Sequence, residues 1–310
     1  MGREVDVIVV GGGVAALTAA TFAARLGLQT VVVADVLIGG QILNVDEIGN
    51  FPGFPDSISG ADLGALVEQQ ATEAGAEFVF DQAQSITAGA SALTVSGPAG
   101  DVSAPAVIVA TGSTLRRLGV PGEDRLEGRG VSYCGSCDAA MFAGRRVAVI
   151  GGGDSAADEA LVVAEHAAEV VVVLREPELH AAAATRAKVR GHERIHIQTQ
   201  RETLEILGDP VVSGLRLRDL RTDEQYELGV EGVFVFIGLE PNTGLLAPLV
   251  DLDDNGHVAT TPWMETSVPG LFAAGDIRRD SPRQLVNVAS DGATAALAAH
   301  RYVEERRTSL

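Results

Sequence analysis

Residues 7–16 read VIVVGGGVAA, and this stretch decides the fold. The strand predicted over residues 5–10 is almost wholly apolar, which is typical of a strand buried on both faces. In the G-x-G-x-x-A turn that follows, Gly11 permits the tight turn, Gly13 lets a pyrophosphate approach the backbone, and Ala16 keeps the next helix close to the strand. The stretch therefore predicts the first unit of a dinucleotide-binding fold, with an anion site at the N-terminus of the helix.

The second strand of this unit is predicted over residues 30–33 and is followed by Asp35. A carboxylate at the end of this strand typically bonds the ribose of a bound adenosine. Asp35 lies 24 residues after Gly11 (35 − 11), close to the usual spacing of about 20. We therefore assign Asp35 to this role.

A second copy of the pattern begins 140 residues after the first (151 − 11). A strand is predicted over residues 145–150, a helix over residues 157–167, and a further apolar strand that ends at Val173. The turn between them repeats G-x-G-x-x-A as Gly151, Gly152, Gly153, Asp154, Ser155 and Ala156. A ligand-free strand–helix corner would account for one copy, but two copies predict two dinucleotide sites in one chain.

The motif that carries redox chemistry is Cys134-Gly-Ser-Cys137, followed directly by Asp138. At the start of a helix, both thiols would lie on one face near free N–H groups that favour a thiolate. Such a pair can exchange with another disulfide near neutral pH, and Asp138 can donate or accept the proton. We predict a redox-active pair, with a structural disulfide and half of a zinc site as the alternatives.

No metal site is predicted. Zinc needs four ligands, and the chain has only these two cysteines. His192-Glu-Arg-Ile-His196 matches the H-E-x-x-H pattern of zinc proteases. The residues from Ile195 onward alternate like a strand, however, and an extended backbone would not hold both histidines on one helical face.

Composition limits the function classes. The 310 residues leave room for about two domains, and 46% hydrophobic residues with 36 glycines are typical of a globular α/β protein. The formal net charge of −19 argues against nucleic acid and anionic membranes as partners. The sequence has no apolar run long enough to span a membrane, and its cysteines fit a reducing compartment. We therefore expect a cytoplasmic protein.

Further motifs end predicted strands or fill the loops between them. Gly39-Gly40-Gln41 and Asn50 fall in a loop region, Thr111-Gly112 follows a buried strand at residues 106–110, and residues 270–276 read GLFAAGD. This last stretch predicts a buried strand that delivers Asp276 at its carboxyl end. Ligands gather at that edge of a parallel sheet.

With these residues in hand, the chain resembles the low-molecular-weight thioredoxin reductases over nearly its whole length. The motifs fall in that family's order: GGGVAA, GGQI, NFPGFP, ATGS, CGSCD, GGGDSAADEA, IGLEPNT, and GLFAAGD followed by RQLVNVASDGATAA. The resemblance implies an α/β fold of two Rossmann-like domains, one inserted in the other. An FAD-binding domain would comprise residues 1–116 and 247–310, and an NAD(P)-binding-like domain with the C-x-x-C would comprise residues 117–246. Homodimers are the usual state of the family.

The resemblance also implies site residues. It assigns FAD to Gly11, Gly13, Ala16, Asp35, Gly39, Gly40, Gln41, Asn50, Thr111, Gly112, Gly275, Asp276, Arg283, Gln284 and Leu285. It assigns a nicotinamide dinucleotide to Gly151, Gly153, Asp154, Ser155, Ala156, Glu159, Arg175, Glu176, Ile237 and Gly238. By the resemblance, Asp276 would bond the ribitol chain of FAD, and Gln284 and Leu285 would lie near the flavin ring.

The implied reaction is a relay from a nicotinamide through FAD and the Cys134–Cys137 disulfide to thioredoxin. Cys137 would face the flavin, Cys134 would attack the partner's disulfide, Asp138 would be the acid, and Arg129 resembles a thioredoxin-docking residue. In this family the inserted domain rotates, which implies hinges near residues 115–121 and 240–245.

The chain departs from the family where that family holds the 2′-phosphate of NADPH. The family reads His-Arg-Arg-x-x-x-Arg, and this chain reads LREPELH over residues 174–180, so Arg175 remains, Glu176 replaces an arginine and His180 replaces another. A carboxylate at this corner bonds a ribose hydroxyl and repels a phosphate. NADH is then a candidate donor. A dithiol oxidase that does not use NADPH and a non-catalytic flavin-binding module are the alternative functions, and Asp138 favours the reductase because such oxidases tend to carry histidine there.

Overall fold

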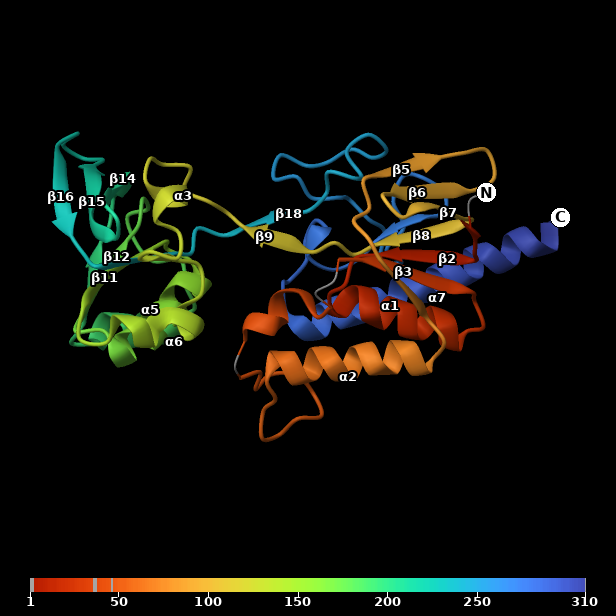
Figure 1. Ribbon diagram of the computed structural model, residues 1–310, viewed down its shortest axis with the longest axis horizontal. Coiled ribbons are helices and arrows are strands. Elements are labelled where there is room, and N and C mark those ends of the chain that lie inside the picture. Colours follow the sequence, from red (N-terminus) through yellow and green to blue (C-terminus); the bar gives the residue numbers. More distant parts are fainter. Residues whose placement is uncertain (1–2, 36–37, 46, 310) are drawn as a thin grey trace. The chain divides into compact units, whose positions relative to one another are not determined.

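The computed structural model describes residues 3–35, 38–45 and 47–309. The chain divides into two compact units. Unit 1 comprises Met1–Thr114 and Glu240–Leu310, and unit 2 comprises Leu115–Leu239, so unit 2 is inserted in unit 1 (Figure 1).

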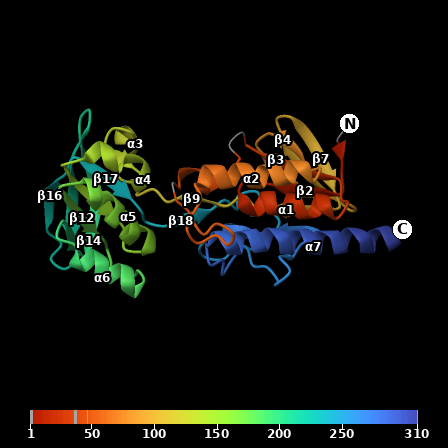
Figure 2. The same ribbon diagram turned by 90° about the horizontal axis from the view of Figure 1, so that it is seen from below.

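Unit 1 is built around a five-stranded parallel sheet. The strand order is β19 (Leu271–Ala273), β8 (Ala106–Val109), β2 (Val7–Val10), β3 (Thr30–Ala34) and β4 (Glu77–Phe80). The central strands are apolar on both faces because each face is covered. One face carries α1 (Val14–Arg25), α2 (Gly60–Glu73) and α7 (Leu285–Ser309), and α7 runs alongside α1 (Figure 2).

The other face of this sheet packs against a four-stranded sheet in the order β1 (Arg3–Glu4), β7 (Gly100–Ala104), β6 (Leu93–Gly97) and β5 (Ser85–Ala88). Successive side chains of β2 point to opposite faces of the sheet, so they divide between the cores on those two faces. Val7 and Val9 pack with the helices, and Ile8 and Val10 pack with the second sheet.

Unit 2 repeats these three layers. Its parallel sheet has the order β10 (Val131–Ser132), β17 (Gly232–Val235), β11 (Arg146–Ile150), β12 (Glu169–Val173) and β13 (Ile195–Gln198). Helices α5 (Asp154–His166) and α6 (Ala183–Gly191) pack on one face. The antiparallel strands β14 (Arg201–Gly208), β15 (Val212–Asp219) and β16 (Gln225–Gly229) cover the other. The predicted α/β fold with two Rossmann-like units is therefore confirmed.

Short elements complete the two units. Unit 1 has the 3-10 helices η1 (Gly40–Asn44) and η3 (Gly275–Ile277), and unit 2 has α3 (Glu123–Leu126), α4 (Gly135–Asp138) and η2 (Ala139–Phe142). The N-terminus of α2 is capped by Ser59, whose Oγ accepts the N–H of Asp62 at 3.0 Å. His192 caps the end of α6 and His196 lies in β13, so the H-E-x-x-H residues share no helical face.

The chain crosses between the units through two short strands that pair with each other, β9 (Ser113–Leu115) and β18 (Leu239–Pro241). The first crossing lies within two residues of the predicted position near Arg116. The second lies earlier than expected, because residues 240–246 belong to unit 1. Leu246 is fully buried in the core of that unit, which accounts for the difference.

A buried carboxylate holds the segment through which the chain enters unit 2. Glu123 is 2% exposed, and it accepts the N–H groups of Leu118 at 2.9 Å and Gly119 at 2.7 Å. It also accepts the hydroxyl of Tyr133 at 2.7 Å. Burial and this hydrogen bond raise the pKa of the Tyr133 phenol well above its usual range, so it remains a donor. Since Tyr133 directly precedes Cys134, one carboxylate ties the entering segment to the cysteine motif.

Substituting Glu123→Leu should lower the free energy of unfolding of unit 2 by about 3 kcal/mol, because three donors lose a charged acceptor. The matched control is Glu127→Gln, which removes only the charge of an exposed partner of Arg117 and should cost less than about 1 kcal/mol. Urea unfolding followed by circular dichroism would measure both. Equal costs for the two variants would contradict this account.

Candidate active site

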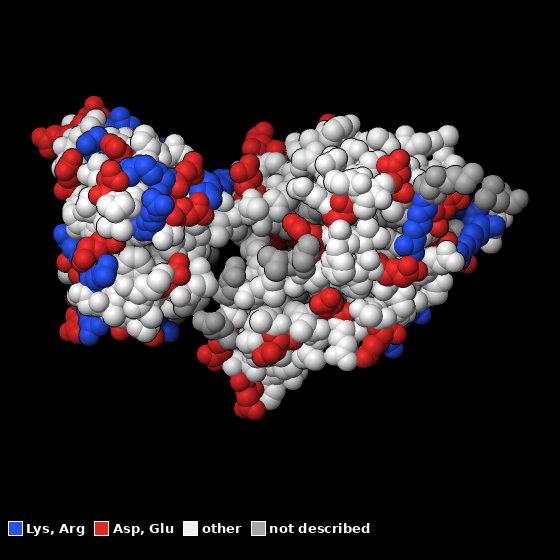
Figure 3. Space-filling model, viewed as in Figure 1, with Lys and Arg blue, Asp and Glu red and all other residues white. Residues whose placement is uncertain are grey.

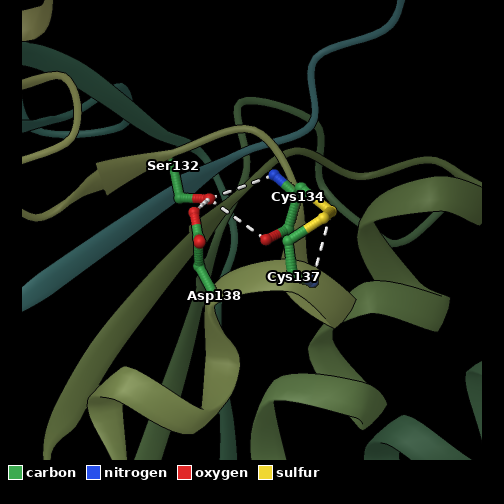
Figure 4. Close-up of a disulfide and its surroundings, with 4 residues drawn as sticks. All are labelled: Ser132, Cys134, Cys137 and Asp138. Atoms are coloured by element: carbon green, nitrogen blue, oxygen red, sulfur yellow. Dashed lines mark hydrogen bonds between the residues drawn. A yellow bond between two sulfur atoms is a disulfide. The ribbon is translucent and has the colours of Figure 1, made fainter. Parts of the chain in front are cut away.

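Cys134 and Cys137 form a disulfide, and their Cα atoms are 5.4 Å apart. Cys134 is the N-cap of α4, and its Sγ accepts the N–H of Cys137 at 3.2 Å (Figure 4). The cysteine pair therefore lies at the start of a helical turn, which is the condition under which its position favours a thiolate. A main-chain N–H directed at Sγ favours negative charge on the sulfur when the bond is open.

Asp138 is held beside this disulfide by Ser132, a residue that the motif analysis did not identify. Ser132 Oγ donates to Asp138 Oδ2 at 2.6 Å and accepts the N–H of Cys134 at 3.1 Å (Figure 4). Ser132 ends β10, so the sheet sets the position of the carboxylate relative to the sulfur pair. The carboxylate of Asp138 is thus bonded to the same hydroxyl group that holds the main chain of Cys134.

Helix α5 brings Glu159 against the same turn. A Cβ added to Gly135 would lie 2.0 Å from Glu159 Oε2, so a larger residue at this position would require the Glu159 side chain to move. Glu159, which the sequence analysis assigns to the nicotinamide dinucleotide, therefore lies beside the disulfide turn.

Unit 1 contains a cavity of about 930 Å³ at the carboxyl ends of its parallel strands. Most of the residues predicted to hold FAD line it: Gly11, Gly13, Asp35, Gly39, Gly40, Gln41, Thr111, Gly112, Gly275, Asp276, Arg283, Gln284 and Leu285. Asn50 lines an adjoining cavity of about 500 Å³ and donates to Gln284 at 3.4 Å. Ala16 is fully buried in the core beneath the turn, where it lets α1 approach β2.

The geometry of this cavity fits FAD. A Cβ at Gly11 would lie 2.3 Å from the carbonyl oxygen of Ala110, whereas a Cβ at Gly13 would meet no atom within 4 Å and would take up ligand space. Helix α1 follows Gly13, and no side chain of the described residues caps its N-terminus. The first turn of α1 contains no acidic residue. The N–H groups there suit a pyrophosphate. A cavity of this size is within the range of about 300–1,000 Å³ seen for bound small molecules.

Asp276 is half-buried at the floor of this site. Burial raises the pKa of its carboxyl group, while a hydrogen bond from Ser281 and the charge of Arg283 act in the opposite direction. The segment is anchored by Asp291 of α7, which accepts the N–H of Gly275 at 3.2 Å and pairs with Arg278 at 2.8 Å. A carboxylate held in this way can accept hydrogen bonds from the hydroxyl groups of a ligand.

Part of the cavity wall is held by hydrogen bonds between residues that are distant in the sequence. Gln41 Nε2 donates to the carbonyl oxygen of Ser113 at 2.7 Å, and Thr111 Oγ1 donates to the carbonyl oxygen of Asn242 at 2.6 Å. Asn242 Nδ2 returns a bond to the carbonyl oxygen of Thr111 at 2.9 Å. Asn242, within the IGLEPNT motif, and Asp291, within the ASDG stretch, are contributors that the sequence analysis did not assign, although both stand in quoted motifs.

In unit 2 the glycine turn repeats the close approach seen in unit 1. A Cβ at Gly151 would lie 2.0 Å from the carbonyl oxygen of Phe236. The turn residues Gly153, Asp154, Ser155 and Ala156 begin α5, and Asp154 accepts the N–H of Ala182 at 2.7 Å. Ile237 and Gly238 follow β17 at the same edge, since parallel strands end together.

The corner after β12 is acidic. Glu176 Oε2 would lie 3.3 Å from a Cβ on Gly152, so its carboxylate lies against the glycine turn. Arg175 instead pairs with Glu202 at 3.7 Å, and Glu178 pairs with Arg190 at 3.8 Å. His180 donates its main-chain N–H to the carbonyl oxygen of Gly152 at 2.7 Å. The glycine turn of unit 2 therefore has a carboxylate beside it, and the neighbouring Arg175 is paired with another glutamate.

Charge on the surface is mixed. On the face shown in Figure 3, arginines and acidic side chains intermingle over unit 2. Arg129 is exposed in the loop before β10, and its main-chain N–H donates to Leu126 at 2.8 Å. It offers local positive charge in a chain whose net charge is −19.

The described residues contain no group of three or more histidine, cysteine, aspartate or glutamate side chains arranged to hold a metal. Within residues 3–35, 38–45 and 47–309, no helix combines the length and apolar character needed to cross a bilayer.

Comparisons with known proteins agree with this geometry. A family model described as pyridine nucleotide-disulphide oxidoreductase matches residues 5–293. The chain is 40% identical over 304 residues to a thioredoxin reductase of Treponema pallidum (strain Nichols), covering 98% of this chain and 99% of that protein. It is 39% identical to a bifunctional thioredoxin reductase/thioredoxin of Mycobacterium leprae (strain TN), covering 98% of this chain and 67% of that protein.

A solved structure gives the same result. The crystal structure of Lactococcus lactis thioredoxin reductase (FR conformation) superposes with a TM-score of 0.91 at 32% identity, covering 97% of this chain and 99% of that chain. The chain therefore belongs to the pyridine nucleotide-disulphide oxidoreductase family and, within it, to the low-molecular-weight thioredoxin reductases.

Proposed function

We propose that this chain is a thioredoxin reductase that passes electrons from a pyridine nucleotide, by way of FAD and the Cys134–Cys137 disulfide, to thioredoxin. The observation that carries the proposal is the disulfide at the start of α4 with Asp138 held beside it, in a chain whose other unit has a dinucleotide-sized cavity. Membership of the family implies FAD and a pyridine nucleotide, and the bifunctional relative supports thioredoxin as the partner.

The cofactor sites follow the two glycine turns. Unit 1 would hold FAD in its cavity, with the N-terminus of α1 toward the pyrophosphate and with Asp35 and Asp276 toward hydroxyl groups. Unit 2 would hold the pyridine nucleotide at Gly151, Gly153 and the start of α5. When bound, FAD accepts a hydride from the nicotinamide and supplies two electrons to the disulfide.

The chain's own residues complete the transfer to the partner. Once the disulfide is open, the Cys134 thiolate attacks one sulfur of the thioredoxin disulfide and forms a mixed disulfide. The Cys137 thiolate then attacks Cys134 Sγ, which restores the internal disulfide and releases thioredoxin as a dithiol. Asp138 exchanges the proton that each cysteine gains or loses.

The family resemblance gives the expected oligomeric state, and the exposed Arg129 gives the expected contact with thioredoxin. We expect a homodimer in the cytoplasm, with Arg129 contacting an acidic partner. Rotation of unit 2 about the paired crossing strands would present the disulfide alternately to FAD and to thioredoxin.

The acidic corner of unit 2 supports NADH as the donor. Glu176 lies against Gly152, where it can accept a hydrogen bond from a ribose 2′-hydroxyl and would repel a 2′-phosphate. Arg175, the arginine that remains in this segment, pairs with Glu202 at 3.7 Å. The same observation favours, as the second candidate function, a dithiol oxidase that takes electrons from a small dithiol and does not use NADPH.

Anaerobic mixing separates these functions. A thioredoxin reductase, purified with FAD, should lose its flavin absorbance within seconds of adding NADH and recover it when oxidised thioredoxin follows. A dithiol oxidase would stay oxidised with either nucleotide until a small dithiol is added. A binding module would respond to neither, and Cys137→Ser would leave its behaviour unchanged.

Substituting Asp138→Asn should slow thioredoxin reduction by about a hundredfold, because the amide can neither give nor take the proton. The rate of flavin reduction by NADH should change little, since that step precedes thiol chemistry. Asp158→Asn, on the exposed side of α5, is the control. Single-turnover kinetics would measure both steps. An unchanged thioredoxin step would refute the role of Asp138.

Substituting Glu176→Arg should raise kcat/KM for NADPH at least about tenfold and lower it for NADH, because a guanidinium pairs with the 2′-phosphate. Glu178→Arg in the same loop is the control, and its preference should stay within about threefold of the parent. Steady-state assays with both nucleotides would measure the ratio. A parent protein that already prefers NADPH would overturn the donor assignment.

Substituting Asp276→Asn should stabilise the protein without FAD and weaken FAD binding. Burial raises the pKa of Asp276, so the folded state binds its proton more tightly than the unfolded chain, and the ionised carboxylate destabilises the fold near neutral pH. The difference in melting temperature between the variant and the parent should therefore be largest at pH 7. It should shrink as the pH falls, because the parent carboxylate then becomes protonated. Asp280→Asn, at an exposed turn, is the control. A gain that persists unchanged in acid would contradict this explanation.

A further inference from the structure

His257 is a buried histidine of unit 1 that the proposed function does not use. It is 8% exposed and follows the loop of residues 251–256. Its Nε2 lies 3.2 Å from an Nη of Arg283, and its Nδ1 lies 3.5 Å from Asp253 Oδ1. A guanidinium can only donate, so Nε2 is the acceptor in this pair and the ring proton is on Nδ1, facing Asp253.

Asp253 is itself fixed. Its Oδ1 accepts the main-chain N–H groups of Asn255 and His257, both at 2.9 Å, and its Oδ2 lies 3.4 Å from Arg279 Nε. These contacts hold the pKa of Asp253 below its usual range, so the carboxylate stays ionised. The loop therefore presents a charged acceptor to His257 Nδ1 and fixes the orientation of the ring.

Asp253 and His257 together fix the position of the Arg283 side chain. It lines the cavity of unit 1 with a positive φ of 55°, directly before Gln284 and the start of α7. Its charge acts on Asp276, the half-buried carboxylate of the same cavity. Arg283 is an exposed residue, so without its contact to His257 the guanidinium is free to approach the carboxylate of Asp276, which attracts it by its charge.

We infer that His257, oriented by Asp253, is a positioning residue that holds Arg283 away from Asp276. The oxygens of Asp276 then remain available to the hydroxyl groups of the cofactor, and the guanidinium stays at the cavity wall. The inference rests on the proposed function, since it concerns the FAD site. The charged groups around His257 that enter it are Asp253, Arg279, Arg283 and Asp276.

The test is a double-mutant cycle on FAD affinity, measured by fluorescence titration of the protein stripped of its cofactor. His257→Phe should weaken FAD binding about tenfold, because Arg283 is released to Asp276. In the Arg283→Met background the same substitution should change affinity less than about twofold. His257→Gln, which keeps an acceptor for Arg283, should recover most of the loss.

The outcomes separate the inference from the proposed function. A parent protein that binds no FAD would refute the proposed function. If the parent binds FAD, two results would overturn only the role of His257: no effect of His257→Phe, or an equal loss of affinity in both backgrounds.

If His257→Phe yields no folded protein, Asp253→Asn replaces it in the cycle. This variant keeps an oxygen for the loop N–H groups and removes the charge that orients the ring. It should lower affinity in the parent background alone, and equal costs in both backgrounds would again overturn the inference.

Discussion

The structure depends on a main-chain approach that leaves no room for a side chain. In unit 1, Gly11 brings the strand–helix turn so close to Ala110 that a Cβ would lie 2.3 Å from its carbonyl oxygen. In unit 2, a Cβ on Gly151 would likewise lie 2.0 Å from the carbonyl oxygen of Phe236. Each approach places the N-terminus of a helix at the carboxyl edge of a parallel sheet, where loops from several strands meet. The cavity of unit 1 is lined by this turn, and the acidic corner of unit 2 lies beside the corresponding turn.

The disulfide occupies a different part of the same scaffold. It follows β10, an edge strand of the parallel sheet in unit 2, and Ser132 at the end of that strand holds Asp138. On the preceding side, Tyr133 bonds to Glu123, which also holds the segment entering the unit. The cysteine turn is thus supported from both directions by buried polar contacts. A reactive pair needs such support, because it must open and close without losing its geometry.

Local patterns in the sequence were sufficient for the strands, the glycine turns and the start of the helix at Cys134. These features depend on residues within one turn or one strand, where apolar runs and glycine have direct physical meaning. The partners of the site residues were not predictable in this way. Thr111 meets Asn242 across 131 residues, and Asn50 meets Gln284 across 234, because unit 1 packs its first and last segments together. The second crossing was misplaced for a similar reason, since only the packed core shows that Leu246 belongs to unit 1.

The central claim is that a flavin and the Cys134–Cys137 disulfide form one redox unit in this protein. Anaerobic titration of the purified protein with dithionite, followed by flavin absorbance, tests it most directly. The account predicts that about four electrons per FAD are taken up, two by the flavin and two by the disulfide, and about two when both cysteines are replaced by serine. An uptake of about two electrons by the parent protein would contradict it.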